Sequence, residues 1–277
     1  TSKKEKFIAQ CIIPFMTCSA RLPVYALLIG FMYGDEKPLM AGFMMSLMYF
    51  GGILIGSIAA RVISSFVKDT SKPRLLMELP LYRRPHLSVI LMASLSKAKS
   101  FVFKAGPIIF SLAVVLWFAT NFPRPEVIDS SQSATEIAQH SYAAQLGKIV
   151  EPVFLPLGVD WRVGFGLISA FAAREAFVSA LALVFNVEAA EGEAQTQSLI
   201  STMKAAHFPD GTLIFTTASV VGILIFFMIA LQCTSTVGIL KREMGSWKPA
   251  LLQLVLSNLV AYALAALAVS LLKNMGY

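Results

Sequence analysis

The sequence predicts an all-α protein, a polytopic transmembrane helical bundle of about six membrane segments, some of them broken or re-entrant. Three observations lead to this fold class. The 277 residues are 56% hydrophobic and only 14% charged, whereas soluble domains carry about 25% charged residues. Long runs contain no charge, and about 20 apolar residues cross a bilayer as a helix. No stretch alternates polar and apolar residues with the period of two that membrane-spanning strands require.

Four runs can cross a membrane without interruption. Each contains 19 to 29 consecutive uncharged residues: Pro38–Ala60, Ala105–Pro123, Thr212–Leu240 and Pro249–Leu272. Two further runs are interrupted by charges. Phe7–Gly34 contains Arg21. Val163–Val187 contains Arg174 and Glu175 at its middle. Together these runs make six expected membrane segments.

The basic residues gather in loops, above all in Lys68–Lys104, which holds eight lysines and arginines against Asp69 and Glu78. The positive-inside rule places this loop in the cytoplasm. Its second half, from His86, is amphipathic, and we expect a helix at the inner interface that runs into the third segment. The net charge of +7 therefore reflects membrane topology and not nucleic acid binding, because no aromatic residues are interleaved with the basic ones.

The second half of the chain is harder to orient. Arg124–Ser141 is polar and partly acidic, so we expect it outside. Tyr142–Asp160 has an apolar part too short to cross and two prolines, which predicts an interfacial or re-entrant segment. Simple alternation then puts the basic stretch Lys241–Lys248 outside, against the charge bias. Either one interrupted segment fails to cross fully, or the charge rule is broken once.

The stretch "PFMTCSARLPVY" places a thiol between two helix breakers. Pro14 and Pro23 bracket Cys18, and a proline inside a membrane helix kinks or breaks it. Broken helices at membrane depth are tolerated where they line a cavity or are packed within protein. Cys18 and Ser19 are therefore candidates for a transport pathway. The alternative is a structural kink around a buried thiol.

A second thiol, Cys233, lies within the third uncharged run, in "ALQCTSTVG", after a long apolar stretch. Polar side chains surround Cys233, and they need partners in lipid. They either bond back to their own helix or line a polar path. A thiolate with nearby hydroxyls, such as that of Thr234, suits a borderline divalent cation such as Fe(II). Cys11 is interpreted as a core residue.

Arg174 and Glu175 are adjacent, so their side chains point about 100° apart and do not pair well with each other. Charges at mid-membrane are expensive, and we expect each to face a partner on another helix. One interpretation is an ion pair that locks the bundle. The other is that Glu175 acts as a ligand or proton acceptor along a path.

Several catalytic motifs are absent. The sequence has no H-E-x-x-H, no G-x-x-x-x-G-K-[ST] and no G-x-S-x-G, so we expect no zinc-protease site and no P-loop nucleotide site. The three histidines, His86, His140 and His207, all fall in expected loops. A histidine metal cage inside the membrane is therefore not expected.

At this point the motifs resemble a known family. The matching stretches follow in order over nearly the whole chain: "PFMTCSARLPVYALL", "LLMELPLYRRPHL", "FVFKAGPIIF", "IVEPVFLPLGVDWRVGFGLISAFAAREAFVS" and "LQCTSTVGILKREMGSWKPALLQ". They closely resemble the membrane domain of the bacterial ferrous iron transporter B family, FeoB.

The resemblance implies a polytopic inner-membrane permease for Fe(II) with Gate-type parts. It divides the chain into residues 1–66, a first Gate-type part with two membrane segments; 67–104, the basic loop and amphipathic helix; and 105–277, the remaining segments with a second Gate-type part. Cys18 and Cys233 match two cysteines proposed in the family to line the iron path, and Glu175 matches its "[AK][RK]E" stretch. Cys11 matches no family position.

The family also has a cytoplasmic GTPase domain, a helical spacer and an earlier Gate-type stretch, none of which this sequence contains. The chain begins with Thr1, and we expect it to be a fragment or processed piece. The implied partners are membrane lipid, Fe(II) as transported substrate, the GTPase domain, small accessory Feo-type proteins and another copy of the chain. We expect no nucleotide or nucleic acid to bind this chain.

The leading expectation is Fe(II) transport, with Cys18 and Cys233 as metal ligands and Ser19, Thr234 and Glu175 along the pathway. A Gate-type permease for another ion or small solute is the alternative. An intramembrane enzyme with Cys18 as nucleophile is disfavoured, because no histidine lies in an expected membrane segment to act as base. A purely structural module that docks a partner through Lys68–Lys104 is the remaining possibility.

Overall fold

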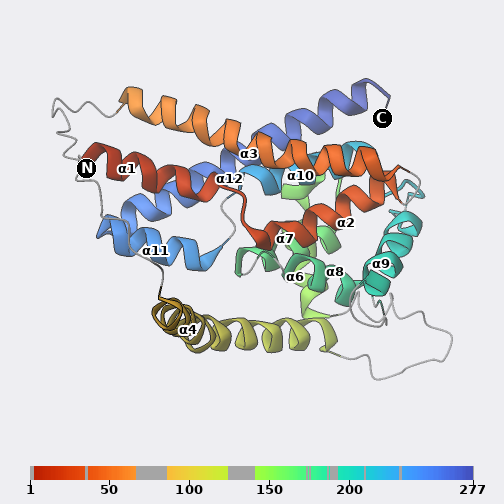
Figure 1. Cartoon of the computed structure of the whole chain (residues 1–277). Coiled ribbons are helices and arrows are strands. Elements are labelled where there is room, and N and C mark those ends of the chain that lie inside the picture. The colour runs from red at the N-terminus through yellow and green to blue at the C-terminus, as the bar shows by residue number, and fades with distance from the viewer. Residues whose placement is uncertain are drawn as a thin grey trace.

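The structure, a computed structural model, describes residues 3–34, 37–66, 86–123, 141–172, 174, 176–185, 187, 193–208, 210–230 and 233–276. These residues are almost entirely helical (Figure 1). The elements are α1 (Lys3–Ile12), η1 (Ile13–Phe15), η2 (Ser19–Arg21), α2 (Leu22–Tyr33), α3 (Pro38–Phe66), α4 (Leu87–Asn121), α6 (Tyr142–Phe154), η3 (Leu155–Leu157), α7 (Trp161–Ala172), α8 (Ala176–Val184), α9 (Glu193–Ala205), α10 (Thr217–Ile229), α11 (Thr234–Met244) and α12 (Trp247–Asn274).

The helices form an all-α membrane bundle, which confirms the predicted fold class. By length and composition, three described stretches are able to cross a membrane: Phe7–Tyr33, Pro38–Ser65 and Trp247–Asn274. A fourth is a broken pair, Tyr142–Leu157 and Trp161–Phe171, which bends by 99°. This pair contains the stretch for which the two prolines predicted an interfacial or re-entrant segment.

The run Thr212–Leu240 does not form the single helix that its uncharged sequence predicts. Thr216 caps α10 through a capping box with Ser219, and the helix ends after Ile229 because Ala230 is extended, with ψ of 139°. A second helix, α11, begins at Thr234. A helix of 13 residues is about 20 Å long, shorter than the ~30 Å hydrocarbon core.

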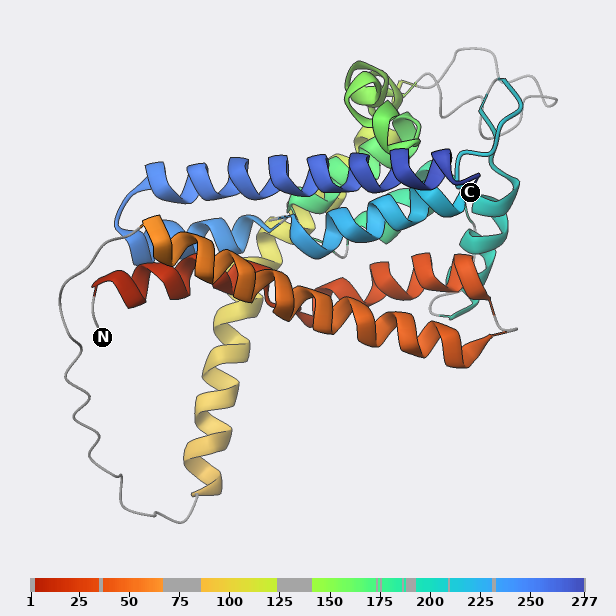
Figure 2. The ribbon, with the colours of Figure 1, turned by 90° about the horizontal axis from the view of Figure 1, so that it is seen from above.

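Several of the helices pack side by side along much of their length (Figure 2). Helices α10 and α11 lie along α12, and α1 and α2 lie along α3. Helix α10 also contacts α2 and α3, and it is almost entirely buried. In contrast, α3 and α12 expose many large apolar side chains, such as Phe43, Phe50 and Leu252. The short α10 thus lies at the centre, and long apolar helices cover it.

Helix α4 joins two of the expected elements. It begins after His86 and continues for 35 residues, so the predicted interfacial helix does run into the third segment. Pro107 lies inside it, and the N-terminal half is seen nearly end-on in Figure 1 while the C-terminal half runs across the view. A proline removes a helical hydrogen bond and kinks the helix. The basic loop at residues 67–85 and the acidic stretch at 124–140 lie outside the described residues.

The α10–α12 contact depends on a glycine. A Cβ atom at Gly222 would overlap Cγ2 of Val269 on α12 and lie 3.6 Å from the carbonyl oxygen of Ala265. Without a hydrophobic effect between helices in lipid, such close backbone approach supplies much of the packing energy.

Replacing Gly222 by alanine is therefore expected to destabilise the protein by about 1–3 kcal/mol. The β-branched Val269 cannot rotate away easily. The measurement is the Tm of the full-length protein in detergent. Gly42→Ala in α3 is the control, since a Cβ there meets nothing within 4 Å. Equal Tm values for the two variants would show that the α10–α12 contact tolerates the added methyl group.

Candidate functional site: three helix breaks joined by an arginine

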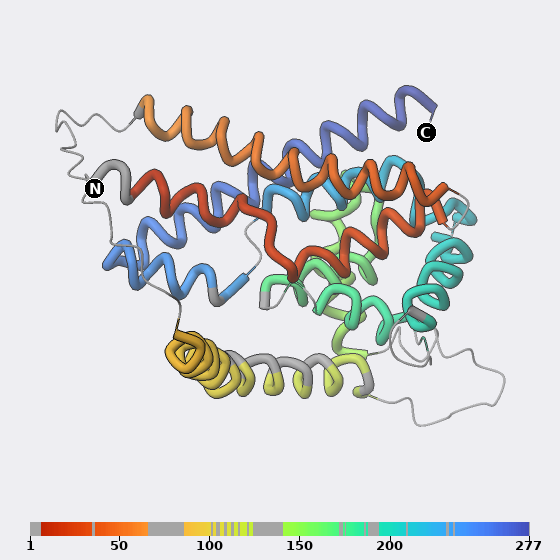
Figure 3. Tube along the Cα trace, in the orientation of Figure 1, coloured from red at the N-terminus to blue at the C-terminus, as the bar shows by residue number. Residues whose placement is uncertain are grey.

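The first break separates α1 from α2 and holds Cys18. Pro14 lies in the η1 turn, and Met16 and Cys18 are both extended, with ψ of 132° and 161°. The break is visible as a step in the red tube of Figure 3. Cys18 is exposed and directly precedes η2. The proline-based prediction of a broken helix around this thiol is thus correct.

The side chain of Arg21 is buried at this break and binds the end of the first helix. Its side chain is 0% exposed. Nη2 donates to the carbonyl oxygen of Pro14 at 3.2 Å, and Nη1 donates to that of Phe15 at 3.4 Å. Carbonyls at the end of a helix carry partial negative charge and lack a helical donor. A buried guanidinium therefore stabilises the broken end of the first span.

The second break lies between α7, which ends at Ala172, and α8, which begins at Ala176. Arg174 lies in it and is only 4% exposed. The sequence analysis expected one membrane segment here with a charged pair at its middle, whereas the structure divides it into two helices. Glu175 itself lies outside the described residues.

The third break follows α10. Ala230 is its extended C-cap, and Cys233 is extended at the start of α11, with φ of −161° and ψ of 111°. The Cys233 side chain is partly exposed, and Thr234, the first residue of α11, is exposed. Cys18 and Cys233 thus occupy equivalent local positions. Each is an extended residue immediately before a new helix.

Arg174 connects all three breaks. Its Nη1 donates to Sγ of Cys18 at 3.6 Å, and its Nη2 donates to the carbonyl oxygen of Ala230 at 3.1 Å. Ala230 lies three residues before Cys233. One side chain from the α7–α8 break therefore reaches both thiol-bearing breaks, as the sequence-based expectation of a partner on another helix requires.

The rings of Phe177 and Phe227 pack beside this connection. Phe177, in α8, lies three residues after Arg174, and Phe227, in α10, lies three residues before Ala230. Both side chains are 0% exposed. Their centroids are 4.8 Å apart in an edge-to-face arrangement. This contact fixes α8 against α10 next to the Arg174–Ala230 hydrogen bond.

The structure also describes Ser19, a predicted pathway residue, and Cys11, which the sequence analysis assigned to the core. Ser19 is exposed at the start of η2. Cys11 is buried, and its carbonyl oxygen accepts a 2.8 Å hydrogen bond from Nε2 of Gln253, in agreement with its interpretation as a core residue. Across the described ranges, no group of three His, Cys, Asp or Glu side chains is placed to hold a metal ion.

The break between η3 and α7 has a different character. Oδ1 of Asp160 accepts from the backbone N–H groups of Arg162 and Val163 at 3.1 and 3.3 Å, which caps α7. Oδ2 lies 3.7 Å from Nε of Arg162. On the outer side of the pair, the Tyr262 hydroxyl of α12 donates to the carbonyl oxygen of Val153 at 2.6 Å. Each of these polar groups has a partner within the fold, so we interpret this bend as a structural feature.

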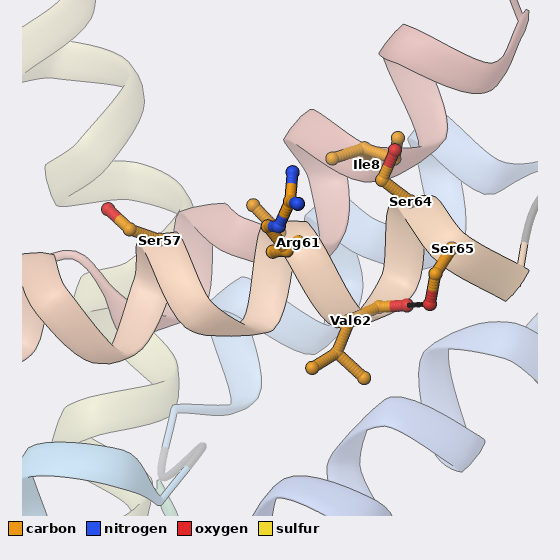
Figure 4. A pocket seen from close by; sticks show the side chains of 7 residues that line it. Ile8, Ser57, Arg61, Val62, Ser64 and Ser65 are labelled. Carbon is orange, nitrogen blue, oxygen red and sulfur yellow. Dashed lines mark hydrogen bonds between the residues drawn. The ribbon is translucent and has the colours of Figure 1, made fainter.

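An open groove of about 730 Å³ lies elsewhere, between α1 and α3. Figure 4 shows Arg61 and three serines along α3, with Ile8 of α1 opposite. It contains none of the predicted site residues. Two of its serine hydroxyls donate to their own helix, Ser57 to Ile53 and Ser65 to Val62.

Sequence reasoning missed two parts of the site. It noted Arg21 as the lone charge of its span but gave it no role. It also missed the Ala230 carbonyl, because no proline or glycine marks the end of α10. The only signal there is the cluster of polar residues that follows.

Broken helices that meet around polar groups inside an apolar bundle are typical of membrane transporters. The chain belongs to the Gate family, whose model, described as nucleoside recognition, matches residues 102–247, just over half of the chain. A second model, Ferrous iron transport protein B C terminus, matches residues 45–97.

Relatives named Fe(2+) transporter FeoB resemble this chain over most of its length. One from Leptospira biflexa is 35% identical over 88% of this chain and 36% of its own length. One from Campylobacter jejuni is 30% identical over 98% of this chain and 43% of its own. A fusion of Fe(2+) transport protein A with FeoB, from Porphyromonas gingivalis, is 28% identical over 96% and 34%. The chain thus spans less than half of these relatives, and no solved structure matches it.

Proposed function

We propose that this chain is the membrane portion of a ferrous iron uptake transporter, a multi-pass protein of the bacterial inner membrane. The relatives named Fe(2+) transporter and the match to the FeoB C-terminal model support the cargo. The three long apolar stretches and the bent pair support the membrane location.

One observation supports the assignment of the pathway residues. Arg174 bonds to Cys18 and to the carbonyl of Ala230, so the breaks that bear Cys18 and Cys233 share a neighbour. We assign these two thiols as the metal ligands. Ser19 and Thr234 directly follow the two thiols in the sequence, and Glu175 directly follows Arg174. We assign these three residues to the pathway.

The chemistry fits a partly dehydrated Fe(II) ion. Thiolate sulfur is a soft ligand that suits a borderline metal and selects against Mg²⁺, which prefers oxygen and keeps its waters. Extended backbone at a break also leaves carbonyl oxygens without helical donors.

The division into residues 1–66, 67–104 and 105–277 is part of this proposal. The relatives are more than twice as long as the chain, which leaves room for a GTPase domain, and the Porphyromonas fusion supports an accessory Feo-type partner. We also propose assembly with further copies of the chain. No nucleotide site is assigned to it.

The alternative is a Gate-type permease for another ion or small solute, which the family description, nucleoside recognition, favours. A thiol enzyme is a weaker alternative. The neighbour that Cys18 bonds is a guanidinium, which has no lone pair to accept a proton and so cannot serve as a general base.

The test is ligand-dependent stability of the full-length protein, purified without oxygen. A ligand at 100 times its Kd adds about 2.7 kcal/mol to stability, so Fe(II) is expected to raise the Tm by several degrees. Mg²⁺ is the control for a hard divalent ion, and uridine and adenosine test the alternative. Stabilisation by a nucleoside without stabilisation by Fe(II) would replace the iron proposal.

A further inference from the structure

We propose that the Arg174 guanidinium is the resident cation of this site: it fills the position between the Cys18 and Ala230 breaks that a transported divalent ion must take, and the two compete for it. The inference deepens the proposed function and rests on it. It makes Arg174 a residue that sets which cations enter and at what concentration.

The partners of Arg174 are the first argument. A thiol sulfur at 3.6 Å and a helix-terminal carbonyl oxygen at 3.1 Å are electron-rich atoms of the kinds that bind a soft or borderline divalent cation. Arg174 uses them as hydrogen-bond acceptors. A metal ion bound to both atoms would need the space between them that the guanidinium fills, and the two positive charges would repel each other, so guanidinium and metal compete for the position.

Burial is the second argument. Arg174 is 4% exposed, and it lies where three broken spans meet. Around such a buried side chain the interaction between charges is stronger than in water, because less solvent screens it. A positive charge fixed there raises the energy of any second cation that enters.

The neighbouring Arg21 decides which guanidinium moves. Both guanidinium groups lie at the Cys18 break, where Arg21 bonds the carbonyls of Pro14 and Phe15 and Arg174 bonds the Cys18 sulfur, so their like charges repel each other. Arg21 is 0% exposed and donates to two carbonyls of its own break, so it is part of the local backbone structure. Arg174 lies in the α7–α8 break and bonds two other parts of the bundle, the Cys18 break and the end of α10. Separation of the α10 end from the Cys18 break would therefore release Arg174 and leave Arg21 in place.

The consequence is selectivity by displacement. A monovalent cation offers no more charge than the guanidinium that it must replace, whereas a divalent ion offers twice as much. Arg174 thus places the Cys18 thiol in a positive field that repels other cations, and a divalent ion that binds sulfur can overcome this field.

The experiment uses the full-length protein in liposomes under anaerobic conditions, with the modification of Cys18 followed by mass spectrometry. The variants are Arg174→Gln, which removes the charge, and Arg174→Lys, which keeps it. Arg162→Gln is the matched control, because it removes a positive charge that pairs with Asp160 away from the Cys18 break.

The first measurement needs no iron. Methanethiosulfonate reagents with a cationic or an anionic head group react with Cys18, and the ratio of their rates reports the local field. Arg174→Gln is expected to raise the cationic-to-anionic ratio by about tenfold or more, given the close spacing of guanidinium and sulfur. Arg174→Lys and Arg162→Gln are expected to keep the wild-type ratio. A wild-type ratio in a folded Arg174→Gln protein overturns the proposal, as does an Arg174→Lys protein that behaves like Arg174→Gln.

The second measurement tests competition. Fe(II) is titrated as a protectant of Cys18, and Arg174→Gln is expected to lower the half-protecting concentration about tenfold relative to wild type and Arg162→Gln. Equal half-protecting concentrations in all variants overturn the proposal. Absence of protection in every variant instead rejects Fe(II) as the ion. In that case the reagent ratio, with Co²⁺, Mn²⁺ and Zn²⁺ as protectants, still decides whether Arg174 is the resident cation.

Discussion

Ferrous iron uptake by the full-length protein is expected to fall to background when Cys18 and Cys233 are both replaced by serine. Serine keeps nearly the same shape but offers a hard hydroxyl oxygen in place of a polarisable sulfur, and Fe(II) then loses both soft ligands. Even changes outside the direct ligands of a metal weaken its binding roughly 10–100-fold. Each single substitution is therefore expected to reduce uptake on the order of tenfold or more.

The measurement is anaerobic uptake of radioactive Fe(II) by cells without another ferrous iron importer, with equal amounts of protein in the membrane. Cys11→Ala is the matched control, because Cys11 is buried in α1 and contacts neither break through its thiol in the interactions described. Its uptake is expected to match wild type. Normal uptake by the double serine variant would remove both thiols from the pathway.

Replacing Phe227 by alanine is expected to give the largest loss of stability. Its ring is fully buried and packs edge-to-face on Phe177 at 4.8 Å. Truncation of a buried phenylalanine costs about 3–5 kcal/mol, mostly through the cavity that remains. We expect the low end, about 3 kcal/mol, because lipid tails reduce the transfer term and leave the lost packing contacts.

The same change is expected to weaken transport beyond its effect on stability. The ring pair holds α8 against α10 beside the hydrogen bond from Arg174 to Ala230, so a cavity there loosens the junction of two breaks. Thermal unfolding in detergent and iron uptake at matched expression are measured together. Phe43→Ala is the control, because its ring is 64% exposed on α3. A Phe227→Ala protein as stable as Phe43→Ala would mean that the ring pair does not hold these helices together.

The breaks that were predictable are those that the local sequence encodes. Pro14 and Pro23 indicated the break around Cys18, and two prolines indicated the bend after α6, because a proline removes a helical hydrogen bond and kinks or breaks the helix. The charged pair at Arg174 indicated a partner on another helix, since charge inside an apolar run demands one, but it did not indicate the helix break there.

The break at Cys233 was not predictable in the same way. Thr212–Leu240 has no charge and no proline, and nothing local forbids a helix across it. The helix ends at the extended Ala230, and the Ala230 carbonyl there accepts a hydrogen bond from Arg174, which lies 56 residues earlier. That bond depends on how distant helices pack, and hydropathy contains no such information. The link between the two thiols through Arg174 was hidden for the same reason.

The shortness of α10 also has an electrical consequence. A helix of about 20 Å cannot span ~30 Å of hydrocarbon, so an ion at the Ala230 end would stand partway through the insulating layer. A membrane voltage supplies about 2.3 kcal/mol per elementary charge for each 100 mV crossed, or about 4.6 kcal/mol for a doubly charged ion over the full drop. An interior-negative cell would then pull such an ion onward with part of that energy, independently of any nucleotide.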